Sequence, residues 1–325
     1  YNLPEEEKKK LKGLPTSLEA ALDALEADHD YLTAGGVFPE ILLQNFIKAK
    51  RQECRQLASI PNPAEFDKDY NLVSLYDKKN HREVITKGKA ANRLFVLENF
   101  PTRWDAWEYQ RSANDKEYDV LGAYDIYTVV DGARTGVHYK KKHMESEIEQ
   151  TVWFYEDMPK IDFDTKVNWQ NERQILKVSF PVDINTDMAT YEIQFGTTKR
   201  PTHYNTSWDH AKYEVCAHKY ADLSEGDYGV ALLNDCKYGH DIHNGDMRLT
   251  LVKCAWNPGN MGDFNDIGMH EFTYSIYPHK GDVASCDVVK YAYDLNLPMT
   301  AVKSEGKGNL SSEYSLVSVN TDNIV

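Results

Sequence analysis

The chain has 325 residues, of which 41% are hydrophobic and 27% charged, so it is long enough to bury a sizeable core and to hold two domains. Its aromatic content of 12% excludes a disordered chain, and its net charge of -14 argues against nucleic acid or an anionic membrane as a partner. No apolar run reaches membrane-spanning length. The sequence contains no C-x-x-C pair, which predicts free thiols in a reducing, cytoplasmic compartment. The five cysteines are Cys54, Cys216, Cys236, Cys254 and Cys286.

Residues 1 to about 60 carry a helical pattern. The stretch LPTSLEAALDALEADHDYL contains a capping box in which Thr16 and Glu19 each satisfy a backbone N–H group of the other. AGGVFPE then predicts the end of one helix at its glycines and the start of the next at Pro39. Two helices of this size bury little apolar surface alone, so we expect them to need a partner surface. The two apolar stripes are Leu18, Leu22 and Leu25, and Leu42, Leu43, Phe46 and Ile47.

After about residue 72 the apolar period changes to that of strands. IDFDTKV, TYEIQFG and EFTYSIY alternate in polarity, and turn motifs such as DGAR, HNGD and EGKGN separate such runs. We therefore predict a mainly β fold, an antiparallel β-sandwich preceded by a short helical segment. Asp162, Asp164 and Lys166 should form a solvated face, which argues against a catalytic pair of carboxylates there. The expected inward residues are Ile161, Phe163, Thr165 and Val167, then Tyr191, Ile193 and Phe195, then Phe272, Tyr274 and Ile276.

Three stretches of the helical part, YNLPEEE, SLEAALDALEADHDYLTAGGVF and IPNPAEFDKDY, follow one another with characteristic spacing. Over residues 1–70 they resemble the C-terminal tail of bacterial type I glutamine synthetase. The resemblance implies a helical region that ends in a strap against a neighbouring subunit, so a homo-oligomer is one expected assembly. The family's ATP-, glutamate- and metal-binding residues precede this region. Tyr1 falls where some members carry an adenylylated tyrosine, although Asn2 stands in place of their usual aspartate; Tyr1 is therefore either a modification site or an ordinary loop residue.

The strand-rich part contains SLYDKKNHREVI, QTVWFYEDMPKIDF, QILKVSFPVDI and a long block from TYEIQFG to GHDI. It resembles the C-terminal β domain of glycoside hydrolase family 38, the α-mannosidases, in the bacterial branch. The resemblance implies a galactose mutarotase-like sandwich over residues 71–325, with residues 1–70 as a separate helical segment. It also implies that the domain continues past the strand-like Val317 and Val319 at the end of the chain.

Members of this family are zinc-dependent retaining α-mannosidases. The resemblance places their aspartate nucleophile and zinc ligands in a preceding α/β catalytic domain, which this sequence lacks. We therefore expect no catalytic residue, metal site or cofactor in this chain, and zinc or another divalent cation only in the full-length mannosidase. The expected partners are that catalytic domain and a mannoside.

The two patterns meet in EFDKDYNLVSLYDKKNHREVI, residues 65–85. DKKN predicts the turn of a β-hairpin. The family would normally lead into this hairpin with another strand, and here a helical tail precedes it. Residues 67–71 are thus expected to be either an improvised strand or an exposed linker.

The block RPTHYNTSWDHAKYE gathers polar residues around one tryptophan. An indole beside carboxylate and amide groups is the composition of a sugar subsite, because the ring stacks on C–H faces while polar groups fix hydroxyls. The alternative is a loop in which Trp208 plugs the sandwich and the polar groups cap turns. Its candidate substrate-binding residues are His203, Trp208 and Asp209.

A second polar loop, LLNDCKYGHDIHNGD, follows a buried strand. It either faces a ligand near the junction with the catalytic domain or forms a tight turn in which Asn234 and Asp235 bond to backbone. Its candidate substrate-binding residues are Asn234, Asp235, Tyr238, His240 and Asp241. In PTRWDAWEY we expect a buried Trp104, with Asp105 bonded to backbone. Two functions therefore remain open beside that of the mannosidase β domain: a carbohydrate-binding or scaffold module, and assembly driven by the helical tail.

Overall fold

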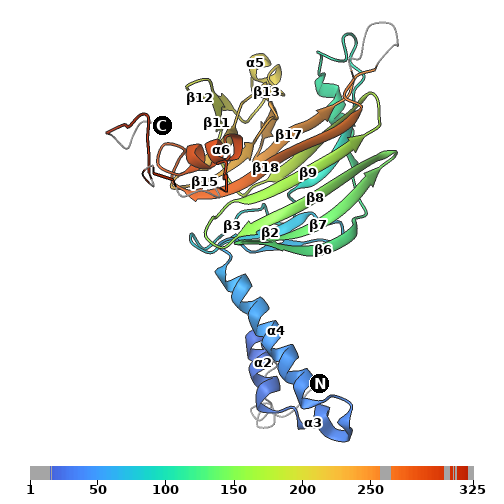
Figure 1. Ribbon diagram of the computed structural model, residues 1–325. Coiled ribbons are helices and arrows are strands. Elements are labelled where there is room, and N and C mark those ends of the chain that lie inside the picture. Colours follow the sequence, from blue (N-terminus) through green and yellow to red (C-terminus); the bar gives the residue numbers. More distant parts are fainter. Residues whose placement is uncertain are drawn as a thin grey trace, which may run out of the picture.

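The computed structural model describes residues 15, 17–256, 265–303, 308, 309, 311 and 313–320. Within them, a large β-sandwich stands on a projecting pair of helices (Figure 1). No helix in these ranges is both long enough and apolar enough to cross a membrane. The predicted class, a mainly antiparallel β fold with a short helical segment before it, is confirmed.

The helical segment consists of α2 (Leu18–Ala27), α3 (Asp30–Thr33), a 3₁₀ turn (Ala34–Gly36) and α4 (Glu40–Ser59). Ser17 caps α2 by accepting a hydrogen bond from the Ala20 N–H at 3.1 Å, so the cap lies one residue later than the predicted Thr16, which is outside the described residues. Gly35 and Gly36 have φ of +80° and +72°, and this left-handed backbone turns the chain between the helices as predicted.

The two long helices pack on each other through a small apolar contact. Leu22, Leu43 and Ile47 are buried, and Arg51 on α4 bonds to Asp23 on α2 at 2.7 Å. Much of the apolar face remains in solvent, as expected for a helix pair without a partner surface. The large exposed residues of this segment are Leu18, Tyr31, Val37, Phe38, Ile41, Leu42 and Phe46.

The sandwich has two main antiparallel sheets and a small third one. The nine-stranded sheet has the order β12-β11-β14-β15-β18-β9-β8-β7-β6, the six-stranded sheet β13-β16-β17-β10-β4-β5, and the small sheet β1-β2-β3. The first strands are β1 (Ala64–Phe66), β2 (Leu72–Asp77), β3 (Arg82–Glu83), β4 (Arg93–Glu98), β5 (Tyr118–Asp119), β6 (Tyr124–Asp131), β7 (Arg134–His143), β8 (Ser146–Tyr155) and β9 (Ile161–Trp169). The others are β10 (Gln174–Pro181), β11 (Met188–Ile193), β12 (Gly196–Pro201), β13 (Val215–Cys216), β14 (Tyr220–Glu225), β15 (Tyr228–Asn234), β16 (Gly239–His243), β17 (Asp246–Lys253) and β18 (Gly268–Lys280). Short helices α5 (Ser207–His210) and α6 (Val288–Asn296) and a 3₁₀ turn (Arg111–Asp115) lie in the connections.

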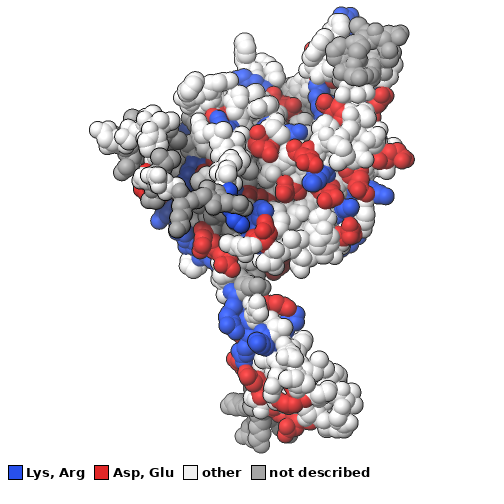
Figure 2. All heavy atoms as spheres, in the orientation of Figure 1, with Lys and Arg blue, Asp and Glu red and all other residues white. Residues whose placement is uncertain are grey.

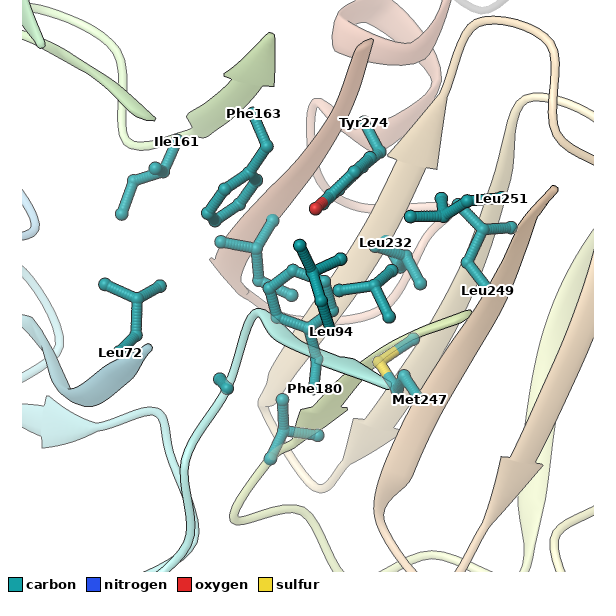
Figure 3. Packing of buried hydrophobic residues seen from close by; sticks show 14 of the residues in the cluster. Leu72, Leu94, Ile161, Phe163, Phe180, Leu232, Met247, Leu249, Leu251 and Tyr274 are labelled. Atoms are coloured by element: carbon teal, nitrogen blue, oxygen red, sulfur yellow. The ribbon is translucent and has the colours of Figure 1, made fainter. Parts of the chain in front are cut away.

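The core lies between the two large sheets (Figure 3). Phe163 on β9 stacks on Tyr274 of β18 at 5.1 Å between ring centroids, and Phe180 from the opposite sheet meets Phe163 edge-on at 5.4 Å. The inward residues predicted on β9 and β18 are all buried, so alternation located these faces correctly. Of the three inward residues predicted in TYEIQFG, Tyr191 is buried and Ile193 is half-buried. Phe195 is wrong: it lies in the β11–β12 turn with φ +57° and is fully exposed.

The outer face of the nine-stranded sheet is not uniformly solvated, which corrects the expectation for β9. Asp164 and Lys166 are exposed, but Asp162 is buried and accepts hydrogen bonds from Lys160 Nζ and Ser275 Oγ, each at 2.5 Å. Lys160 covers the Asp162 carboxylate, so the carboxylate is shielded from water and still has a counter-ion. Elsewhere on this face Figure 2 shows acidic and basic side chains interspersed. The strand expected around Val317 and Val319 is also absent from the described residues 313–320, where both side chains are exposed.

The junction between the two sequence patterns is ordered. β1 pairs antiparallel with β2, and the predicted hairpin joins β2 to β3 through Lys78–His81, where Asp77 accepts a hydrogen bond from the Asn80 N–H at 3.0 Å. Residues 67–71 form neither a strand nor an open linker. They form a closed loop in which Asp67 accepts from the backbone N–H groups of Asp69 and Asn71, both at 2.9 Å.

Candidate functional site

The two predicted polar segments meet on the outer face of the six-stranded sheet, near the end that carries α5 (Figure 1). The connection from β12 to β13 supplies Tyr204 and α5, and β16 supplies Asp241 and His243. Tyr204 donates a long hydrogen bond to Asp241 Oδ1 at 3.4 Å and stacks on His243 with centroids 4.1 Å apart. Tyr204 and Asp241, which are 37 residues apart in the sequence, therefore lie on one surface.

A buried lysine lies at the base of this surface. Lys177 on β10 is fully buried, and its Nζ lies 2.8 Å from Glu214 Oε2 and 3.9 Å from Asp241 Oδ2. Thr250 on β17 donates a second hydrogen bond to Glu214 Oε2 at 2.6 Å, and the Tyr109 ring lies 5.0 Å from the ammonium group. The two carboxylates and the Tyr109 ring stabilise the charge of the buried ammonium group in the absence of water.

The two carboxylates around Lys177 differ in their electrostatics. Burial would raise the pKa of Glu214, but Lys177 and the hydrogen bond from Thr250 outweigh burial and lower it. Burial raises the pKa of Asp241, and Lys177 at its greater distance does not compensate. Burial also disfavours a charged Lys177, yet the pKa of Lys177 is raised, chiefly by Glu214. Glu214 is thus the principal counter-ion, and Asp241 is the less favourably placed charge.

A cationic and aromatic layer covers this centre. The Arg111 guanidinium lies 4.7 Å from the centroid of the Tyr204 ring and contacts the His210 ring of α5. Burial and the neighbouring Asp241 raise the pKa of Tyr204 to about 12, so its hydroxyl stays protonated and remains a donor at neutral pH. No sequence pattern points to Arg111 or Glu214, whereas the lone lysine inside QILKVSF is a visible irregularity in an apolar strand.

Trp208 lies at the outer limit of this surface on α5. Thr206 and Asp209 form a reciprocal capping box at the start of that helix, so Asp209 serves the cap, and His203 Nδ1 lies 3.8 Å from the Asp209 carboxylate. The Trp208 side chain is 79% exposed. The alternative in which Trp208 plugs the sandwich is therefore wrong, while turn capping by the polar residues is confirmed for Asp209.

The five candidates after β15 do not converge. Asn234 Oδ1 accepts from the Lys237 N–H at 2.7 Å and Asp235 Oδ2 from the Thr273 N–H at 2.8 Å, so both stabilise the turn. Tyr238 is half exposed. His240 points to the core side of β16, opposite Asp241, and burial lowers its pKa to about 4. Only Asp241 of this group reaches the site.

Exposed aromatic side chains were missed in the loop after β4. Trp104 and Trp107 are 59% and 74% exposed with ring centroids 5.4 Å apart, so the prediction of a buried Trp104 is wrong. Asp105 does bond to backbone, as predicted, accepting from the Trp256 N–H at 2.9 Å. Trp104 has φ +57°, a backbone conformation that alternation along a strand does not foresee.

Within the described ranges, no group of three or more His, Cys, Asp or Glu side chains is arranged to hold a metal ion. The modification candidate Tyr1 lies outside those ranges. The centre around Lys177 holds a buried charge, because Lys177 and Thr250 both engage Glu214. The exposed groups of the surface above it are the Arg111 guanidinium and the Trp208 indole.

These features define an antiparallel β-sandwich with a polar, aromatic surface on one sheet. The sequence profile of the glycosyl hydrolases family 38 C-terminal domain matches residues 63–260, and the chain belongs to this family. A crystal structure of a family 38 glycosyl hydrolase from Enterococcus faecalis shares the fold, with a TM-score of 0.62 and 14% identity over 77% of this chain and 33% of that one.

The relatives that match most of the chain's length include α-mannosidases. Alpha-mannosidase G of Dictyostelium discoideum is 42% identical over 233 residues, covering 69% of this chain and 21% of the relative. Alpha-mannosidase 2C1 of Homo sapiens is 36% identical over 264 residues, covering 80% of this chain and 25% of the relative. The chain thus spans only about a fifth to a quarter of the length of these relatives.

The helical segment matches a different family. The profile of the glutamine synthetase catalytic domain covers residues 1–69. Glutamine synthetase of Haemophilus influenzae is 44% identical over 70 residues, covering 22% of this chain and 15% of the relative. Both predicted resemblances are confirmed.

Proposed function

We propose that residues 71–325 serve as the β domain of a retaining α-mannosidase and do not hydrolyse mannosides by themselves. In the full enzyme the domain would support an α/β catalytic domain, which supplies the nucleophile and binds zinc, and would form one wall of the sugar site. The observation that carries this proposal is the family match over residues 63–260, with relatives named α-mannosidases. The free cysteines fit a reducing, cytoplasmic setting for that enzyme.

The test is hydrolysis of an aryl α-mannoside by the purified chain, with zinc and with a chelator. We expect no rate above that of the chain carrying Lys177→Met, which disrupts the buried centre. A rate that the chelator abolishes would contradict the proposal, because it would require a complete metal site in this chain.

A second function, carbohydrate binding without catalysis, is favoured by one observation: Trp208 presents most of its indole to solvent on α5, the helix whose His210 contacts Arg111. Such an indole stacks on the apolar face of a pyranose. Titration with a mannoside, followed by tryptophan fluorescence or by NMR, should show binding that Trp208→Ala removes and that Trp104→Ala, in another loop, retains. Absence of binding at about millimolar sugar would reject this function.

For the helical segment we propose a role in assembly, as part of a natural fusion with the β domain. The supporting observation is the apolar surface of α4, where Ile41, Leu42 and Phe46 are 63%, 51% and 48% exposed. Light scattering after gel filtration should give an oligomer that Leu42→Glu dissociates. A monomeric wild-type chain would contradict this role.

A further inference from the structure

The ring of one histidine joins α2 to α4. His29 lies between the end of α2 and the start of α3, and its Nδ1 lies 3.0 Å from the Leu25 carbonyl oxygen. Its Nε2 lies 3.2 and 3.0 Å from the two carboxylate oxygens of Glu40, the first residue of α4. Both partners are acceptors, so the ring donates to both only when it carries two protons and a positive charge. We call these two contacts the helix clasp.

The helix clasp constrains the connection between the helices, residues 28–39. The backbone carbonyl of His29 accepts hydrogen bonds from the N–H groups of Leu32 at 2.9 Å and Thr33 at 3.3 Å, so the residue that holds the ring also begins α3. No side chain of α3 or of the following 3₁₀ turn, all of which the structure describes, is buried. The connection therefore has no core of its own, and the contact of His29 with Glu40 is a main constraint on its position.

The charges around His29 favour the protonated ring. The pKa of His29 is raised, chiefly by the hydrogen bond to Glu40 and then by that to the Leu25 carbonyl. The charges that act on the ring come from Glu40 on α4 and from Asp30 on α3. Gln44 donates to Glu40 Oε1 at 3.1 Å and leaves the charge of the carboxylate unchanged. The helix clasp is therefore complete below about pH 6.5, the ordinary pKa of histidine, and is lost as pH rises through the raised value.

The helix clasp also determines how an apolar surface is arranged. The connection carries the exposed side chains of Tyr31, Val37 and Phe38. Ile41 and Leu42, in the first turn of α4, are exposed as well. Because the clasp ties the connection to that turn, it holds the two groups of apolar side chains in one arrangement.

We propose that the helix clasp makes assembly of this chain dependent on pH, with the associated form favoured at the lower pH. The inference rests on the role in assembly proposed above for the helical segment. With the ring charged, the connection and α4 present one ordered apolar surface to a second copy of the chain. With the ring neutral, one of the two contacts is lost, and ordering the freed connection opposes association. The association constant then falls with the fraction of molecules in which the clasp is formed.

The test follows the mass of the full chain by sedimentation over a range of concentrations, at about pH 6 and about pH 8.5. We expect the association constant of the wild-type chain to fall about tenfold between these two conditions. His29→Gln removes the titrating group, so its association constant should change by less than about twofold. His270→Gln is the matched control: this ring on β18 contacts the Asp266 carbonyl oxygen at 2.7 Å, and the variant should keep the wild-type response. His279 titrates in the same range in all three chains, so the comparison isolates His29.

Hydrogen exchange gives a readout of the helix clasp that does not depend on assembly. At a concentration where the chain is monomeric, the protection factors of residues 30–36 should fall at the higher pH in the wild-type chain and stay constant in His29→Gln. Glu40→Gln removes the charged partner and should reduce the pH dependence in the same way, which provides the readout if His29→Gln does not fold.

The outcomes separate this inference from the assembly role on which it rests. An oligomer whose association constant is the same at both pH values would overturn the inference and leave the assembly role standing. An oligomer that His29→Gln leaves as dependent on pH as the wild-type chain would do the same. A chain that is monomeric at every pH and concentration would contradict the assembly role itself.

Discussion

Replacing Lys177 by methionine should destabilise the sandwich strongly. The ammonium group is fully buried 2.8 Å from Glu214 and 3.9 Å from Asp241, so its removal leaves two carboxylates without a counter-ion. Removal of one partner of a buried pair costs about 3 to 5 kcal/mol, a large share of the total stability of about 5 to 15 kcal/mol that a domain has. Urea unfolding followed by circular dichroism measures this loss. Lys166→Met is the control: this lysine is paired with Glu271 at the surface, and its loss should cost about 0 to 1 kcal/mol.

The two carboxylates should respond with opposite signs. Glu214→Gln should destabilise the folded state, because the pKa of Glu214 is lowered on folding and its charged form therefore stabilises the fold. This contribution is complete above about pH 4.3, the pKa of Glu in the unfolded chain, and is lost as pH falls through the pKa of the folded state. Asp241→Asn should be neutral or stabilising, because the raised pKa of Asp241 means that its charged form opposes folding above about pH 3.9. A Lys177→Met variant within about 1 kcal/mol of wild type, or an Asp241→Asn loss equal to that of Glu214→Gln, would refute this account.

Three further predictions concern separate parts of the chain. Gly229→Ala should cost about 1 to 3 kcal/mol in urea unfolding, because its Cβ would meet the buried His279 ring. Gly196→Ala, with open space around it, should be neutral, and equal costs for the two variants would contradict the packing argument. The free energy of unfolding should fall by about 2 to 3 kcal/mol between about pH 6.5 and 9, because the pKa of the buried His279, paired with Asp222, is raised in the folded state. This stabilising contribution is complete below the pKa of the unfolded state and is lost as pH rises through the pKa of the folded state. Asp222→Asn should flatten this profile, and an unchanged slope would exclude the His279–Asp222 pair as its cause. Ile47→Ala should loosen only α2 and α4 in hydrogen exchange, and loss of protection in the sandwich would show that the two parts unfold together.

The inner faces of the sandwich were predictable because a strand has a period of two and only one of its faces meets the core. Alternation cannot tell whether the other face meets water. Asp162 and Lys177 are buried on outer faces, because another charged group or a connecting segment covers them. A sequence shows the polarity of each position, whereas the covering segment comes from elsewhere in the chain.

The candidate site was predictable only in part for a related reason. Asp241 and Tyr204 belong to two polar blocks whose composition was visible, but their contact depends on the pairing of β13 with β16. His240 and Asp241 are adjacent in sequence and therefore point to opposite faces, so a compact polar motif did not produce a compact site. The exposure of Trp208 depends on the capped turn that carries it.

The junction at residues 63–69, matched by both family profiles, is part of the β fold. Asp67 closes the loop to Asn71, and Asn71 Oδ1 accepts a hydrogen bond from the buried Lys141 at 3.0 Å, so the loop satisfies a cation inside the sandwich. Asp67→Ala removes the acceptor of two backbone N–H groups, and we expect a loss of about 1 to 3 kcal/mol. Trypsin gives a local readout: the exposed Lys68 should resist cleavage in the native chain and become sensitive in this variant, while Lys303, in exposed coil, should be cut in both. Rapid cleavage at Lys68 in the wild-type chain would mean that the junction is an open linker after all.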